Sequence, residues 1–145
     1  MDINGLIMHH FFQLTRIISR SLNNHFSPYN LHVSEWGIIL TLMEKGMMTQ
    51  RDLAKYLNIE PSAVSRSLVG LQKKGYIMRK VGVDRRERNI FLTELAIKQY
   101  RVWDSIACQY RQDILADLSE EKKQELYMLL EAVFQTAHYK ADDKI

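Results

Sequence analysis

The chain has 145 residues, of which 46% are apolar, so it can bury a core of its own and is not a disordered chain. The net charge is only +3, and the single cysteine, Cys108, excludes an intramolecular disulfide and favours a reducing compartment. The first residues lack a basic segment before a long apolar run, and no uninterrupted apolar stretch reaches about 18 residues. We therefore expect no signal peptide, no membrane-spanning helix and a cytoplasmic location.

The first predicted helix covers residues 3–22, where apolar side chains recur at three- and four-residue steps and form one stripe. The segment SPYN at 27–30 ends it. Ser34 is the expected N-cap of a second helix through EWGIILTLMEK, which Gly46 ends. Two helices therefore open the chain.

Two shorter helices are predicted next. Thr49 begins the segment TQRDLAKYL, and Thr49 and Asp52 have the spacing of a capping box with Asp in place of Glu. Asn58 ends this helix, Pro61 suits the first turn of PSAVSRSLVGLQKKG, and Gly75 closes that second helix. Two short helices joined by a brief turn, the second rich in Ser and Arg, are typical of a helix-turn-helix.

The segments YIMRKVGVD and ERNIFLT then predict the two strands of a hairpin whose tip is too polar for a core. After Thr93 the helical spacing of apolar residues returns, and Ser119 is the expected cap of a last helix with a stripe from Leu126 to Phe134. The tail, residues 138–145, is expected to fray. The predicted order is therefore four helices, a hairpin and two more helices.

The second helix of the helix-turn-helix has two different faces. Its apolar residues at i, i+4 and i+7 must face the core, and these are Val64, Leu68 and Leu71. The opposite face carries small hydroxyls and one guanidinium, from Ser62, Ser65 and Arg66 beside Val69. Small side chains let a helix sit deep in a major groove, where Ser reaches phosphates or base edges and Arg pairs with guanine. The alternative is an ordinary amphipathic helix with a serine-rich solvent face.

The hairpin also has two interpretations. Its tip, with Asp84, Arg85, Arg86 and Arg88, is either a solvated charge run or a device that holds arginines toward an anion. The charge distribution favours the second, because residues 49–92 hold ten Lys/Arg and four Asp/Glu, while the rest of the chain holds ten and thirteen. Arginine suits a narrow minor groove beside a helix in the major groove, and Asp84 can pair with Arg86 across the turn.

At this point the sequence resembles the MarR family of bacterial transcription regulators. The core match is TQRDLAKYLNIEPSAVSRSLVGLQKKGYIMRKVGVDRRERNIFLTE, residues 49–94, with an Asp-x-Arg wing at 84–86 and a strand ending in Leu-Thr. The long flanking helices fit the family order too. The resemblance implies a mainly α (α+β) fold, a winged helix-turn-helix with long flanking helices that form a dimerisation region.

The resemblance also implies a division of the chain. Residues 1–145 would be a single MarR-like domain, with 34–93 as the DNA-binding lobe and 1–30 and 94–140 as the helical dimerisation region. Members are homodimers that place two recognition helices on a pseudo-palindromic operator, with half-sites about one turn (~34–36 Å) apart. The apolar terminal helices independently favour a dimer, since they exceed what a small winged-helix core can cover. The alternative is a monomer that packs them on its own core.

Site residues follow from the same match. Arg86 matches the wing arginine, Asp84 its orienting acid, and the start of the third helix matches a phosphate contact. The expected DNA-binding residues are Thr49, Gln50, Ser62, Ser65, Arg66, Lys73, Asp84, Arg85 and Arg86. The family also implies a small aromatic effector that lowers DNA affinity, and the residues expected to line its pocket are Arg16, Tyr29, His32 and Trp36.

Other classes are disfavoured. Cys108 lies away from the position where one branch of the family senses peroxides, and the histidines lack ligand spacing, so we expect neither a thiol switch nor a metal or cofactor. No phosphate loop, GxSxG or HExxH occurs, so we do not expect an enzyme. We expect a sequence-specific DNA-binding regulator, a repressor, with a winged-helix protein-interaction module as the alternative.

Overall fold

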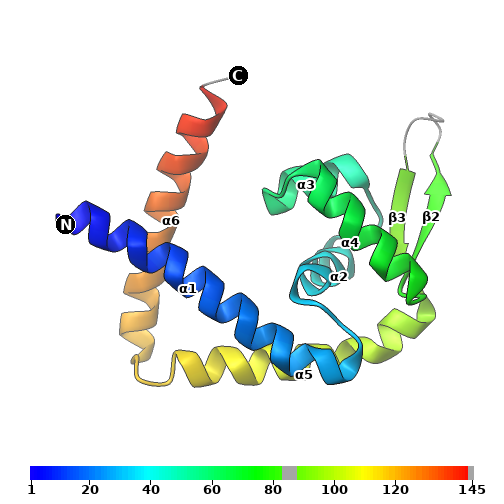
Figure 1. Ribbon diagram of the computed structural model, residues 1–145, viewed down its shortest axis with the longest axis horizontal. Helices are drawn as coiled ribbons and strands as arrows, with labels where there is room; N and C mark the ends of the chain where they lie inside the picture. Colours follow the sequence, from blue (N-terminus) through cyan, green and yellow to red (C-terminus); the bar gives the residue numbers. More distant parts are fainter. Residues whose placement is uncertain (83–87, 144–145) are drawn as a thin grey trace. The chain divides into compact units, whose positions relative to one another are not determined.

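The computed structural model describes residues 1–82 and 88–143, and it forms two compact units, Met1–Ala107 and Cys108–Ile145 (Figure 1). The elements are α1 (Ile3–Phe26), the 3-10 helix η1 (Ser27–Tyr29), α2 (Val33–Lys45), β1 (Met48–Thr49), α3 (Gln50–Leu57), α4 (Pro61–Lys73), β2 (Ile77–Val81), β3 (Arg88–Leu92), α5 (Glu94–Ile114) and α6 (Glu120–Asp142). The predicted order of six helices around one hairpin is confirmed. The fold is mainly helical with one small sheet, as expected.

The sheet has three antiparallel strands in the order β1-β3-β2. The predicted hairpin pairs Ile77 with Leu92 at one end and Val81 with Arg88 at the other. β1 has two residues and pairs on the other side of β3, with Met48 opposite Ile90. The sequence did not predict β1, because a two-residue strand has no periodicity and depends entirely on its distant partner.

The core of the first unit takes buried side chains from each of its α-helices. Phe26 at the end of α1, Ile39 of α2, Leu53 of α3 and Leu68 of α4 are completely buried. Trp103 of α5 is also fully buried, and its indole nitrogen donates to the carbonyl of Tyr29 at 3.2 Å. The boundary between the compact units falls inside α5, after Ala107, because the first part of α5 shares this core.

Most helix ends follow the predicted signals. The Thr49 hydroxyl accepts from the amide of Asp52 at 3.1 Å and caps α3. Asn58 ends α3 in the left-handed conformation at φ 53°, and the positive φ values of Gly46 and Gly75 explain why helices end there. Ser119 caps α6 as expected.

Two predicted ends were wrong. The N-cap of α2 is His32 and not Ser34, because the His32 Nδ1 accepts from the Ser34 amide at 3.2 Å, while Glu35 accepts from the His32 amide at 3.0 Å. An imidazole nitrogen thus replaces the usual hydroxyl oxygen as the hydrogen-bond acceptor of the N-cap. The tail does not fray at residue 138 but stays helical to Asp142. Side chains four residues apart still contact one another there, because the His138 ring stacks on Phe134 and its Nε2 lies 3.6 Å from the Asp142 carboxylate.

None of the helices in the described part of the chain is both long enough and apolar enough to cross a membrane. The apolar side chains of α6 are nevertheless exposed in the single chain, including Leu130, Val133 and Phe134. Several apolar residues of α1 are exposed as well, among them Leu6, Phe12 and Ile17. An exposed apolar surface of this kind marks a contact surface.

We expect Leu68→Ala in α4 to destabilise the protein by about 2–5 kcal/mol, because it leaves a cavity in a fully buried site. Val69→Ala is the matched control on the next residue, where the side chain is exposed and the loss should stay below about 0.5 kcal/mol. Denaturant unfolding of both variants measures the difference. Equal losses would contradict the orientation of α4.

Candidate nucleic-acid interface

The face of α4 that the sequence predicted to read DNA is turned away from the core. Val64, Leu68 and Leu71 are at most 1% exposed, and they anchor one side of the helix. Ser62, Arg66, Val69 and Lys73 are exposed and Ser65 is partly exposed. The chain therefore presents two hydroxyls and a guanidinium along one outward stripe, while the buried side sets the orientation of the helix.

The start of α3 lies near α4, because Arg79 of β2 donates both to Gln50 at that start and to Gln72 of α4. Thr49 is partly buried and its hydroxyl already accepts from the Asp52 amide. Gln50, the first residue of α3, is partly buried too, and its side-chain oxygen accepts from Arg79 of β2 at 3.2 Å. An amide nitrogen can only donate, so the donating end of Gln50 is the one left for an outside acceptor.

Arg79 is a residue that sequence reasoning missed. Its Nε also donates to the side-chain oxygen of Gln72 in α4 at 3.1 Å, so one guanidinium joins α3, α4 and β2. The fork of guanidinium donors is suited to holding two acceptors in a fixed geometry. Strand alternation is the sequence signal that could have predicted its position, because it puts Arg79 on the same face of β2 as the buried Ile77.

The wing is described only at its base. β2 packs against α4 and pairs with β3 (Figure 1), and the last paired residues of the two strands are Val81 and Arg88. Lys80 and Arg88 are exposed there. The predicted contacts Asp84, Arg85 and Arg86 lie outside the residues that the structure describes.

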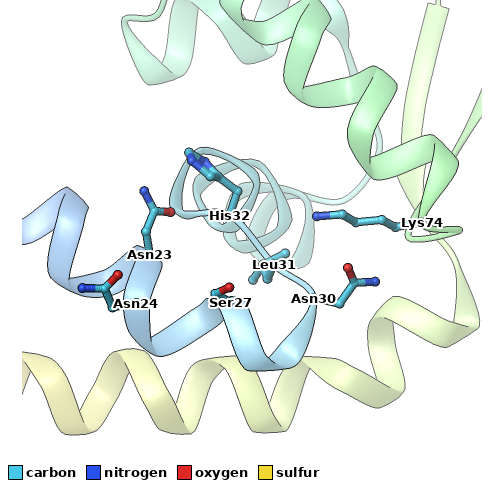
Figure 2. Close-up of a pocket in the computed structure, with 7 residues that line it drawn as sticks. All are labelled: Asn23, Asn24, Ser27, Asn30, Leu31, His32 and Lys74. Carbon is cyan, nitrogen blue, oxygen red and sulfur yellow. The ribbon is translucent and has the colours of Figure 1, made fainter.

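A cavity of about 370 Å³ lies where the end of α1, the start of α2 and the end of α4 meet (Figure 2). It is lined by Asn23, Asn24, Ser27, Asn30, Leu31, His32 and Lys74. Of the four residues expected to line an effector pocket, His32 lines this cavity, whereas Arg16 is exposed on α1 and Tyr29 is about half exposed. Trp36 is a core residue, because its ring packs between Phe26 and Tyr100 at centroid distances of 5.7 and 5.5 Å.

Within residues 1–82 and 88–143, no group of three or more His, Cys, Asp or Glu side chains is placed to hold a metal ion. Cys108 is partly buried, and its sulfur accepts a weak hydrogen bond from Gln112 at 3.7 Å. The residues that gather at an outward face are instead basic and hydroxylic, on α4 and the hairpin strands.

Comparison with known proteins identifies the family of the chain. The model of the MarR family matches residues 29–87. A Bacillus subtilis protein, the uncharacterized HTH-type transcriptional regulator YwoH, is 31% identical over 122 residues, which is 84% of this chain and 89% of that protein. The chain belongs to the MarR family. As a MarR-family transcriptional regulator it is a DNA-binding protein and not an enzyme.

Solved structures of other MarR-type regulators share the fold. Staphylococcus aureus MepR, in a complex with DNA, superposes with a TM-score of 0.83 at 24% identity and covers 89% of this chain and 96% of its own. The organohalide-sensing regulator RdhR-CbdbA1625, bound to 2,4-dichlorophenol, gives a TM-score of 0.86 at 24% identity over 94% of this chain and 82% of its own. At these identities the likeness is one of fold.

Proposed function

We propose that this MarR-family regulator is a cytoplasmic repressor that binds a pseudo-palindromic operator as a homodimer and is released by a small-molecule effector. The observation that carries the proposal is the outward stripe of Ser62, Ser65 and Arg66 on a helix whose opposite side is fully buried. A helix held this rigidly can present the same three side chains to base edges at every encounter.

The remaining DNA contacts are proposed around that stripe. Thr49 and Gln50 start α3, and a helix start favours phosphate through its free amides and dipole. Lys73 is exposed at the end of α4, where its ammonium suits a phosphate oxygen. The wing residues Asp84, Arg85 and Arg86 lie in the sequence between the basic strands β2 and β3, and Arg86 is assigned to the minor groove. MepR was solved with DNA on the same fold, which supports this arrangement.

We propose that a second copy of the chain covers the exposed apolar surfaces of α1 and α6, so that the protein is a homodimer. Phe12 and Ile17 of α1 and Leu129 and Phe134 of α6 are 49–66% exposed in the single chain. A second copy offers the same surfaces, so each of them can be covered by its counterpart in a twofold assembly. Within this proposal residues 34–93 read DNA, and residues 1–30 and 94–140 hold the dimer together.

Repression follows when an operator-bound dimer blocks transcription, and an effector that favours a non-binding state relieves it. The RdhR structure holds dichlorophenol on the same fold, which supports the proposal that a small molecule binds this chain.

The test of the proposal is selection of bound fragments from a random duplex library at two salt concentrations. We expect one enriched palindrome with half-sites about 34–36 Å apart, and binding that weakens with a log–log salt slope of about −0.9 per phosphate neutralised. No enrichment after unfolding and refolding to remove bound ligand would contradict sequence-specific reading. That outcome would favour the protein-interaction module.

We expect Gln50→Glu to weaken operator binding about tenfold without loss of stability. The carboxylate keeps the Arg79 contact and suits the first turn of a helix, but it has no donor and repels phosphate. Fluorescence anisotropy gives the affinity and thermal unfolding gives the stability.

Gln72→Glu is the matched control, since it adds the same charge to the other acceptor of the same guanidinium. We expect it to weaken binding much less. Equal losses in the two variants would mean that the added negative charge alone weakens binding. That result would contradict a direct contact between Gln50 and DNA.

A further inference from the structure

The cavity between α1, α2 and α4 has an unusually polar lining. Six of its seven lining side chains end in a nitrogen or oxygen group, and Leu31 is the exception (Figure 2). Its volume of about 370 Å³ falls in the range of small-ligand sites, which are mostly apolar. A lining of amides, a hydroxyl, an imidazole and an ammonium selects a ligand by hydrogen bonds and charge.

Existing hydrogen bonds decide which ends of these groups remain for a ligand. The Asn23 oxygen accepts from the amide of Val33 at 2.7 Å, so its amide nitrogen remains as a donor. The His32 Nδ1 accepts from the Ser34 amide, which assigns the proton of the neutral ring to Nε2. Asn30 donates to the Tyr76 hydroxyl at 3.4 Å, so its carbonyl oxygen remains as an acceptor.

Lys74 provides the positive charge of the lining. Its ammonium lies 2.7 Å from Glu35 Oε2, and its side chain is 26% exposed, so solvent still reaches it. An ammonium has three donors, and Glu35 takes one of them. Figure 2 shows the Lys74 side chain reaching from the end of α4 toward the space beside Asn30 and Leu31.

We propose that this cavity binds a small hydroxylated anion, a carboxylate or phosphate of about a dozen non-hydrogen atoms, and that its binding lowers the affinity for DNA. The Lys74 ammonium and the Asn23 and His32 donors receive the anionic oxygens, and the Asn30 carbonyl accepts from a ligand hydroxyl. This ligand class differs from the aromatic effector that the family resemblance implied.

Ligand binding in the cavity is coupled to DNA binding through the inner side of α4, and this coupling rests on the proposed function. Ser67 donates to Ser34 at 3.3 Å, and Lys74 pairs with Glu35 about two turns further along. Between them lies Gly70, where an added Cβ would come within 2.8 Å of Glu35 Oε1, so the carboxylate lies directly against the helix. An anion that draws Lys74 away from Glu35 loosens the C-terminal end of α4, and with it the orientation of the helix that carries Ser62, Ser65 and Arg66.

The first experiment uses the full chain without DNA and follows the side-chain amide signals of Asn23 and Asn30 by NMR. The probes are malate and glycerol 3-phosphate, with succinate as the partner of malate that lacks the hydroxyl. We expect saturable shifts with dissociation constants below about 1 mM, and binding of succinate about fivefold weaker than that of malate. The two hydroxylated probes separate a carboxylate site from a phosphate site. Shifts that stay linear with all three probes would overturn the proposal.

The decisive variant is Glu35→Gln/Lys74→Gln, which removes the charge of both partners and leaves no unpaired buried carboxylate. We expect it to lose at least tenfold in probe affinity, whereas Lys98→Gln, which removes a lysine from an exposed position of α5, should bind like wild type. Circular dichroism confirms that each variant is folded. Unchanged probe affinity in the double variant would contradict the site.

The second experiment measures binding of the selected duplex with and without the stronger probe. We expect a saturating probe to raise the DNA dissociation constant at least fivefold, and DNA to raise the probe's constant by the same factor. Equal DNA affinity with and without a bound probe would overturn the coupling but not the site. A ligand-free chain that binds no duplex would instead refute the proposed function, since probe binding is measured without DNA.

Discussion

Leu130→Glu combined with Val133→Glu is expected to convert the proposed dimer into monomers at micromolar concentration. Both side chains lie on the apolar stripe of α6 and are 42% and 46% exposed in the single chain. In a twofold dimer the two substitutions place four carboxylates in the contact. Each removes an apolar side chain worth roughly 1.5–3 kcal/mol when buried, so the dissociation constant should rise at least about 100-fold.

Analytical ultracentrifugation measures this change, and operator binding should fall with it because a monomer reaches only one half-site. Met128→Glu is the matched control, since it makes the same kind of change on the opposite side of α6, where Met128 is 70% exposed. We expect that variant to remain dimeric. A double variant that stays dimeric, or a monomeric wild type, would contradict the proposed dimer surface.

Arg66→Ala is expected to cost about 1–3 kcal/mol in binding to the selected operator, roughly 5- to 150-fold, and to abolish discrimination at one base pair. Arg66 is exposed on the outward side of α4, where its guanidinium can make a bidentate contact with guanine. Competition by operators with single base changes measures both effects. The fold should be unaffected, because the buried side of the helix is unchanged.

Arg51→Ala is the control, since it removes one exposed positive charge from α3 and should weaken binding to all sequences equally.

The wing is tested in parallel: Arg86→Ala should weaken binding and relax the A·T preference beside each half-site, and Asp84→Ala should do the same more mildly. If Arg66→Ala, Arg86→Ala and Asp84→Ala all bound the operator like wild type, the assigned roles would be wrong.

Local patterns in the sequence were enough to predict the helices, the hairpin and the outward side of α4. Helix ends at Gly46, Asn58 and Gly75 were predictable because each of these residues adopts a positive φ that most others avoid. The orientation of α4 was predictable because the spacing of Val64 and Leu68 puts both on one side of a helix. These features depend only on residues a few positions apart.

Other features of the candidate site depend on residues that are distant in the sequence. Arg79 meets Gln50 across 29 residues, and Lys74 meets Glu35 across 39. The cavity likewise takes its lining from α1, the segment before α2, and the end of α4. Such contacts leave no periodic signal, because each polar side chain has many potential partners until the packed core brings one of them within hydrogen-bond distance. The sequence by itself therefore determined which side of α4 faces outward, and the tertiary structure decided what holds that side in place.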